Sequence, residues 1–167
     1  ILMYHSVRLG NSSKNMWSLD SNYFSEHLSY LHEKKDIHLY SCTDLVESIP
    51  ENGIMITFDD GYRDNFEIAA PILFELKIPF SVFVVTDYIR NEKKGFMNPG
   101  MLRELSKNPL VTIGSHSKSH IPLTSCNQEE LKIEISESKS YLEDLLGEEI
   151  SMFSYPHDKF NSLVKDA

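Results

Sequence analysis

Short apolar runs along the chain alternate with segments in which apolar residues recur every three or four positions. The apolar runs predict strands at Ile1–Tyr4, Ile37–Tyr40, Ile54–Phe58, Pro79–Val85, Leu110–Gly114 and Ser151–Tyr155. The periodic segments predict helices at 21–35, 43–48, 63–77, 98–107, 127–147 and 161–167. Because strands and helices alternate without an internal repeat, the pattern predicts an α/β fold with a parallel sheet, open or closed into a barrel.

Several predicted helices carry recognisable ends. Ser21 is placed to cap the first helix. Asn127 and Glu130 have the spacing of a capping box, and Gly147 supplies a stop for the helix that they begin. Pro71 falls inside the segment 63–77, where we expect a kink or a break.

The strand at 54–58 stops at two adjacent carboxylates, Asp59 and Asp60, followed by Gly61. Neighbouring side chains of a regular strand point to opposite faces, so these two acids converge only if the backbone turns. A glycine can adopt the positive φ that such a turn needs. The sequence therefore predicts a turn that brings both carboxylates to one site, or, alternatively, an acid that caps the next helix.

Histidines follow three other predicted strands, at His5, His116, His120 and His157. The carboxyl ends of parallel strands meet at one edge of the sheet, where α/β enzymes keep their active sites. We therefore expect these histidines to lie close to the two carboxylates.

His116 and His120 are spaced to bind one ion from a tight loop or a helical turn, although such a pair alone also suits a surface or structural role. Two imidazoles and one carboxylate, Asp60, are the ligand pattern of catalytic zinc, which keeps a coordination position open. Asp59 would then remain as a base for an attacking water. This arrangement predicts a hydrolase of amides or esters.

The same three ligands also describe the facial triad of non-haem iron oxygenases. A chain that alternates strand and helix argues against that class, whose members generally use a β-sandwich. A second acid beside the ligand also suits hydrolysis better.

The composition of the chain excludes some classes of binding partner. The 167-residue chain has a formal net charge of −9, which argues against nucleic acid or an anionic membrane as partner. No stretch has the length and apolar character of a membrane span or a signal peptide. Cys42 and Cys126 are far apart and lack metal-ligand spacing, so we expect free thiols.

Three segments, Thr57–Tyr62, His116–His120 and Ser154–His157, in this order and spacing, resemble the first three motifs of the polysaccharide deacetylase family. This family is also called the NodB-homology domain or carbohydrate esterase family 4. The opening segment Met3–Val7 resembles the branch that contains poly-N-acetylglucosamine deacetylases and enzymes of surface-polysaccharide synthesis.

The resemblance implies a distorted (β/α) barrel and metal-dependent removal of N-acetyl groups from N-acetylglucosamine-containing polysaccharide, at linear amide C–N bonds. It implies that Asp59 is the general base and that Asp60, His116 and His120 hold Zn²⁺, or alternatively Co²⁺ or Ni²⁺. The backbone amide of His157 would help to stabilise the oxyanion. An N-acetylated glycan is then the partner, and an extracellular or cell-envelope location is favoured.

Two departures from the family pattern keep alternatives open. Ser154 replaces an arginine that orients the base in many members, and the family's late Leu-x-His motif, which supplies the general acid, has no counterpart before Ala167. We therefore expect residues 1–167 to form one deacetylase domain that lacks its last strands, with His157 or His5 as the acid available within it. The alternatives are a degenerate glycan-binding protein and a hydrolase of small cyclic amides or imides.

Further residues near the predicted strand ends are candidates for contact with the substrate. They are His5, Tyr62, Tyr155 and Pro156.

Overall fold

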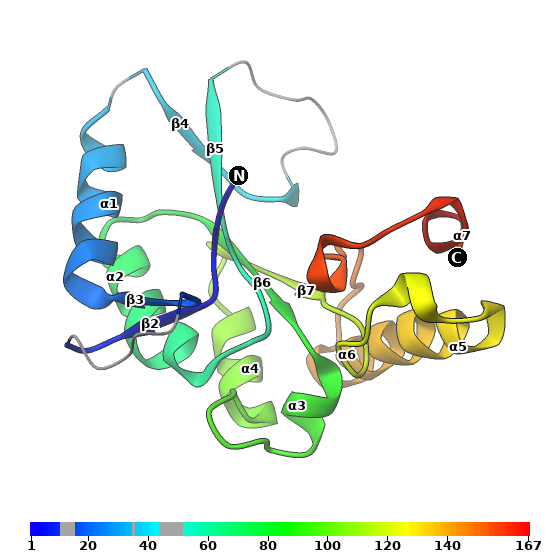
Figure 1. Cartoon of the computed structure of the whole chain (residues 1–167). Helices are drawn as coiled ribbons and strands as arrows, with labels where there is room; N and C mark the ends of the chain where they lie inside the picture. The colour runs from blue at the N-terminus through cyan, green and yellow to red at the C-terminus, as the bar shows by residue number, and fades with distance from the viewer. Residues whose placement is uncertain (11–15, 35, 44–51) are drawn as a thin grey trace.

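The computed structural model describes residues 1–10, 16–34, 36–43 and 52–167 (Figure 1). A parallel sheet runs through the molecule, with the strand order β1-β5-β6-β7 and with β4 paired to the first half of β5. The strands are β1 Leu2–Tyr4, β4 His38–Tyr40, β5 Gly53–Phe58, β6 Phe80–Val84 and β7 Val111–Ser115. The predicted α/β class with a parallel sheet is confirmed.

The register of the sheet places the strand ends side by side. Tyr4 of β1 pairs with Phe58 of β5, and Phe58 pairs with Val82 of β6. Val84 of β6 in turn pairs with Ser115 at the end of β7. The residues that follow β1, β5 and β7 therefore leave the sheet at one edge.

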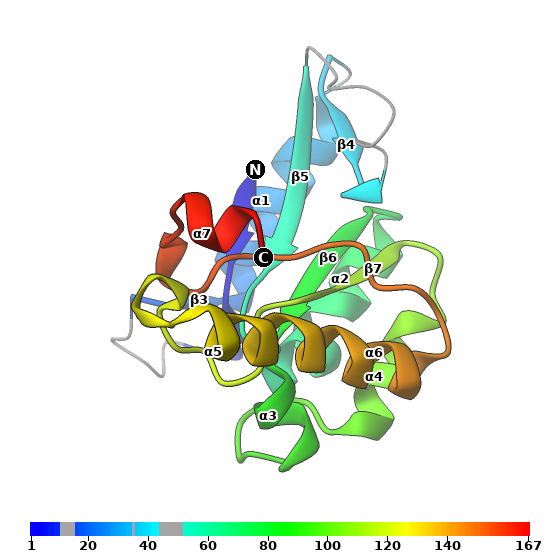
Figure 2. The ribbon, with the colours of Figure 1, turned by 90° about the vertical axis from the view of Figure 1, so that its right-hand side faces the viewer.

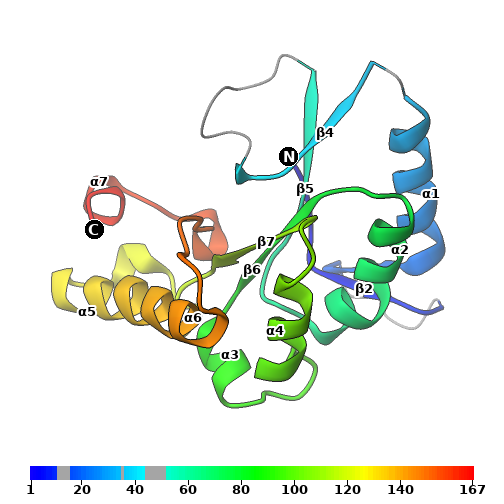
Figure 3. The same ribbon diagram turned by 180° about the vertical axis from the view of Figure 1, so that it is seen from behind.

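Helices pack on both sides of this sheet and bury its apolar side chains. Helices α1 Ser21–Glu33, α2 Ala70–Glu75 and α4 Pro99–Ser106 lie together on one side (Figure 3). In the core, Phe58 makes ring contacts with Phe24 of α1 at 5.9 Å and with Phe80 of β6 at 5.8 Å between centroids. All three rings are fully buried, so this cluster fixes α1 against the strands.

A long helix covers the side of the sheet next to β7 and α4 (Figure 2). It is built from α5 Gln128–Lys132, a π-helical turn η4 Ile133–Glu137 and α6 Ser138–Leu146. The predicted capping box of Asn127 with Glu130 is present, and Gly147 ends the helix in a left-handed conformation with φ of 74°. Both predicted ends of this helix are confirmed.

The segment 63–77 also contains a π-helical turn, η2 Asn65–Ala69, which leads into α2. Pro71 is the second residue of α2, directly after the π-helical turn, and the chain stays helical through it. The smaller helices are α3 Thr86–Arg90, η3 Leu123–Ser125, η5 Pro156–Asp158 and α7 Ser162–Lys165. The sequence pattern did not predict α3.

Other predictions need correction. Asp20, and not Ser21, caps α1, because its side chain accepts a hydrogen bond from the Asn22 amide at 2.8 Å. The predicted strand Ser151–Tyr155 is reduced to a single bridge between Phe153 and Ser115. Pro156 follows directly and prevents a longer ladder. Most of the predicted helix 43–48 lies outside the described residues.

A second sheet of two short strands, β2 Ser6–Arg8 and β3 Ser18–Asp20, lies in a region for which no strand was predicted. The carboxylate of Asp64 stabilises it from outside, accepting hydrogen bonds from the Ser6 hydroxyl at 2.5 Å and the Val7 amide at 3.2 Å. A partner nearly sixty residues away leaves no trace in the local sequence pattern.

None of the helices in the described ranges has the length and apolar character needed to cross a bilayer.

The predicted turn after β5 involves two residues, because Asp60 and Gly61 both have positive φ, of 72° and 78°. A Cβ atom at Gly61 would also lie only 2.8 Å from Cγ1 of Val84. Backbone conformation and lack of space therefore both require glycine at this position.

We predict that Gly61→Ala destabilises the protein by about 2–5 kcal/mol, the sum of about 1–2 kcal/mol for the left-handed conformation and about 1–3 kcal/mol for overpacking. Gly95→Ala is the matched control, since Gly95 has φ of 93° and a Cβ atom added there would have open space within 4 Å. Gly95→Ala should lose only the stability that depends on the left-handed backbone conformation. Urea unfolding measures both, and equal losses would contradict the steric part of the argument.

Candidate active site

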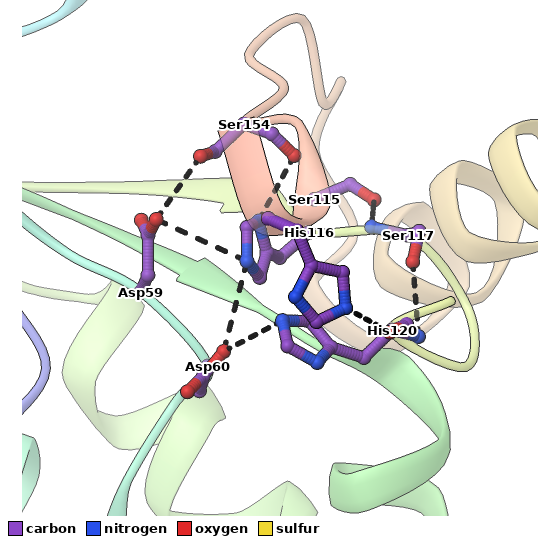
Figure 4. Close-up of polar contacts among 8 residues, drawn as sticks. Asp59, Asp60, Ser115, His116, Ser117, His120 and Ser154 are labelled. Atoms are coloured by element: carbon purple, nitrogen blue, oxygen red, sulfur yellow. Dashed lines mark hydrogen bonds and ion pairs between the residues drawn. The ribbon is translucent and has the colours of Figure 1, made fainter. Parts of the chain in front are cut away.

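A cavity of about 340 Å³ opens where β1, β5 and β7 end. Asp59 and Asp60 enter it from the end of β5, and His116 and His120 enter it from the loop after β7 (Figure 4). The two carboxylates and both imidazoles thus meet as the sequence predicted. The turn at Asp60 and Gly61 makes this convergence possible.

Asp60, His116 and His120 form a compact group of candidate metal ligands. Oδ1 of Asp60 lies 3.6 Å from Nε2 of His116 and 3.2 Å from Nε2 of His120. One ligand atom from each residue lies within 4.8 Å of the others. Within the described residues, this buried Oδ1 atom has no hydrogen-bond partner. An unpaired buried carboxylate oxygen that faces two imidazole nitrogens is the environment that a divalent cation satisfies, so the residues fit a metal.

The orientation of His116 also suits a metal ligand. Its Nδ1–H donates to the backbone carbonyl of Ser154 at 2.9 Å, because a carbonyl can only accept. The neutral ring then presents the lone pair of Nε2 toward Asp60. Burial lowers the pKa of His116 to about 4, so the ring is neutral at physiological pH.

The loop that carries both histidines adopts unusual backbone conformations. Ser117 and His120 both have positive φ, of 65° and 66°. The Ser117 hydroxyl accepts a hydrogen bond from the His120 amide at 3.1 Å, and the Ser115 hydroxyl accepts one from the Ser117 amide at 3.2 Å. These serines turn the chain so that the two rings lie 5.0 Å apart.

Asp59 lies beside the ligand group with its Oδ2 atom 3.9 Å from Nε2 of His116. The Ser154 hydroxyl donates a hydrogen bond to the same oxygen at 3.2 Å. Burial, with the charge of Asp60 adding to it, raises the pKa of Asp59 to about 7, although the bond from Ser154 opposes the rise. Ser154 has no charge with which to form the ion pair of an arginine, but its hydroxyl still contacts Asp59.

His157 lines the same cavity and has a positive φ of 60°. Its Nε2–H donates to the backbone carbonyl of His120 at 3.1 Å, and the two rings are 4.5 Å apart. His157 is thus placed next to a candidate ligand and remains exposed to solvent.

The remaining predicted residues surround the cavity to different degrees. His5, Tyr62 and Tyr155 line it, whereas Pro156 is buried and lies outside the lining. The His5 ring lies 4.6 Å from the Trp17 ring, and burial lowers the pKa of His5.

Three residues that were not predicted line the cavity next to Tyr62, namely Tyr88, Lys93 and Phe96. Tyr62 stacks on Phe96 with centroids 4.7 Å apart, and Phe96 packs on Tyr88 at 4.5 Å. The ammonium of Lys93 lies 3.4 Å from the centre of the Tyr88 ring. Tyr88 lies on α3, and Lys93 and Phe96 lie in the loop that follows it, without a regular spacing that the sequence pattern could reveal.

Comparison with known proteins shows which family the chain resembles. A family model described as polysaccharide deacetylase matches residues 47–167. The Bacillus subtilis (strain 168) protein YxkH, by its name assigned to the polysaccharide deacetylases, is 27% identical over 96% of this chain. The poly-beta-1,6-N-acetyl-D-glucosamine N-deacetylase of Staphylococcus aureus (strain MRSA252) is 25% identical over 96% of the chain. The chain spans 57% and 64% of the lengths of these two relatives.

A solved structure confirms the predicted fold. The Streptococcus pyogenes deacetylase PplD, solved in complex with acetate, superposes with a TM-score of 0.88 at 19% identity, covering 99% of this chain and 76% of that one. The predicted (β/α) fold of the deacetylase type is thus shown by the superposition. Since the family model covers most of the residues, the chain belongs to the polysaccharide deacetylase family.

Proposed function

We propose that the chain is a metal-dependent hydrolase that removes N-acetyl groups from N-acetylglucosamine-containing polysaccharide. The convergence of Asp60, His116 and His120 on one point, with a second carboxylate beside them, carries this proposal. The relative from Staphylococcus aureus, named for this reaction on poly-N-acetylglucosamine, supports the choice of substrate.

Asp60, His116 and His120 would hold the ion, and Zn²⁺ best suits two imidazoles with one carboxylate, with Co²⁺ or Ni²⁺ as substitutes. A divalent ion in this position supplies a Lewis acid for the amide carbonyl and lowers the pKa of water to about 7.

The residues around this group would manage the protons. Asp59, held by the Ser154 hydroxyl, accepts a proton from the attacking water. The C–N bond of the tetrahedral intermediate then breaks, and the amine leaves with a proton. His157, whose ring lies 4.5 Å from that of His120, is our candidate within this chain for the oxyanion contact and for the proton donor, with His5 as the alternative donor.

The aromatic residues around the cavity suit a sugar ring. Tyr62 lies on one wall, stacked on Phe96, and His5 lies at the cavity against Trp17. Flat aromatic faces bind the apolar faces of sugars with little loss of side-chain entropy. We propose that the glycan contacts these two groups and Tyr155 while its acetamido group faces Asp59.

We predict that Asp60→Ala lowers the affinity for Zn²⁺ by at least about 100-fold, because loss of a direct ligand should exceed the 10–100-fold that outer partners contribute. Elemental analysis and competition with a chromophoric chelator measure the affinity. Asp158→Asn is the matched control, since Asp158 lines the cavity outside the ligand group. Equal affinity in wild type and Asp60→Ala would contradict the site.

We predict that Zn²⁺ binding displaces a proton from Asp59 below neutral pH. The raised pKa of about 7 means that Asp59 is largely protonated near pH 6 in the metal-free protein. A nearby cation favours the carboxylate, so binding at about pH 6 should release up to about one proton more from wild type than from Asp59→Asn. The difference should vanish by about pH 9. Titration calorimetry in buffers of different ionisation enthalpy measures the release, and identical values at pH 6 would refute it.

We predict that Asp59→Asn retains Zn²⁺ and loses about 10²–10⁴-fold in the rate of acetate release from N-acetylglucosamine oligomers, the typical contribution of a general base. Glu67→Gln is the control, because Glu67 is exposed and pairs only with Arg63 at 3.6 Å in the described structure. Full activity in Asp59→Asn would contradict its role. Metal binding without acetate release in the wild-type chain would direct the proposal toward another amide or toward glycan binding.

A further inference from the structure

Glu134 is a buried carboxylate that contacts the histidine loop without being a candidate ligand. Its side chain accepts three hydrogen bonds, from the Ser119 hydroxyl at 2.6 Å, the Ser119 amide at 2.9 Å and the Lys118 amide at 3.1 Å. The residue is only 6% exposed. All three donors lie between His116 and His120 in the sequence.

These bonds give the Ser119 amide its acceptor and give the Lys118 amide a second one, beside the backbone carbonyl of Glu134 at 3.1 Å. The loop turns through positive φ at Ser117 and again at His120, so its amides do not belong to a helix or a strand. Hydrogen bonds to a charged acceptor are roughly twice as strong as neutral ones. The Glu134 carboxylate therefore fixes the residues just before His120.

The same long helix holds the loop at a second point. The hydroxyl of Ser138, one turn after Glu134, is hydrogen-bonded to the hydroxyl of Ser115 at 2.7 Å, and both residues are buried. Glu134 lies inside the π-helical turn η4, and Ser138 follows it immediately. Single π-helical turns within α-helices occur frequently at functional sites. This helix thus contacts the chain at Ser115, just before His116, and at Lys118 and Ser119, just before His120.

We propose that Glu134 is a positioning residue for the metal centre: its carboxylate holds the backbone of Lys118 and Ser119 so that Nε2 of His120 faces Asp60. This inference rests on the metal site proposed above. A contact that served stability alone would leave the affinity for the metal unchanged once the protein is folded.

Four variants test the proposal. Glu134→Ala removes all three bonds and should weaken Zn²⁺ binding about 10–100-fold, as outer-shell partners of metal ligands do. Glu134→Gln should stay within about 5-fold of wild type, because the amide oxygen can accept from both backbone donors while its NH₂ group donates to the Ser119 hydroxyl. Ser119→Ala keeps the backbone bonds and should give an intermediate loss.

The matched control is Glu137→Ala. Glu137 lies on the same helix and binds the same residue, but its exposed carboxylate contacts the side-chain ammonium of Lys118 at 2.7 Å. Its removal should leave the affinity for Zn²⁺ unchanged. The Co²⁺-loaded proteins add a geometric readout, since the visible absorption bands should change in Glu134→Ala and not in Glu137→Ala.

Amide hydrogen exchange provides a measurement without metal. Peptides that cover residues 115–121 should exchange at least about 10-fold faster in Glu134→Ala than in wild type or Glu137→Ala, because the Ser119 amide loses its acceptor and the Lys118 amide keeps only the backbone carbonyl of Glu134. Unchanged exchange, or unchanged Zn²⁺ affinity in a folded Glu134→Ala, would overturn the proposal. If Glu134→Ala does not fold, wild-type affinity in Ser119→Ala would do so. Absence of Zn²⁺ binding in wild type would instead refute the proposed function, while the exchange result still decides the role of Glu134.

Discussion

The arrangement of the site depends on one electrostatic requirement, the compensation of the buried Asp60 carboxylate. Its Oδ1 atom has no hydrogen-bond partner in the described structure and faces the imidazole nitrogens of His116 and His120. Burying an uncompensated carboxylate is costly, and two neutral imidazoles offer lone pairs, not charge. A cation is the species that satisfies all three groups together, and the surrounding backbone is shaped to hold them around it.

That shaping comes from three separate parts of the chain. The left-handed pair at Asp60 and Gly61 turns the end of β5, while the long helix holds the loop after β7. The segment after residue 150 then adds Ser154 from the far side of β7. Each part would be ordinary alone. Because the strands of the sheet are parallel, these three parts meet at one edge of it, and the site therefore depends on the whole fold.

Much of this could be predicted from the sequence, because strong local signals coincide with the fold. The strand that ends at Asp59 and the spacing of His116 and His120 predicted both the sheet edge and the ligand group. What escaped prediction depends on distant partners. The β2–β3 sheet is stabilised by Asp64, and Glu134 binds a loop that is separated from it in the sequence by a turn of 3₁₀ helix and the whole of α5. Such contacts have no period in the sequence.

Ser154 contacts the site through two chemically different atoms. Its hydroxyl donates a hydrogen bond to Asp59, the proposed base, whereas its backbone carbonyl accepts one from His116, a candidate metal ligand. Every amino acid carries that carbonyl, so replacing the side chain leaves the ligand contact available while altering the environment of the base. The environment of Asp59 and the orientation of His116 are therefore separable at this position, since a substitution can alter the first while the backbone keeps the second.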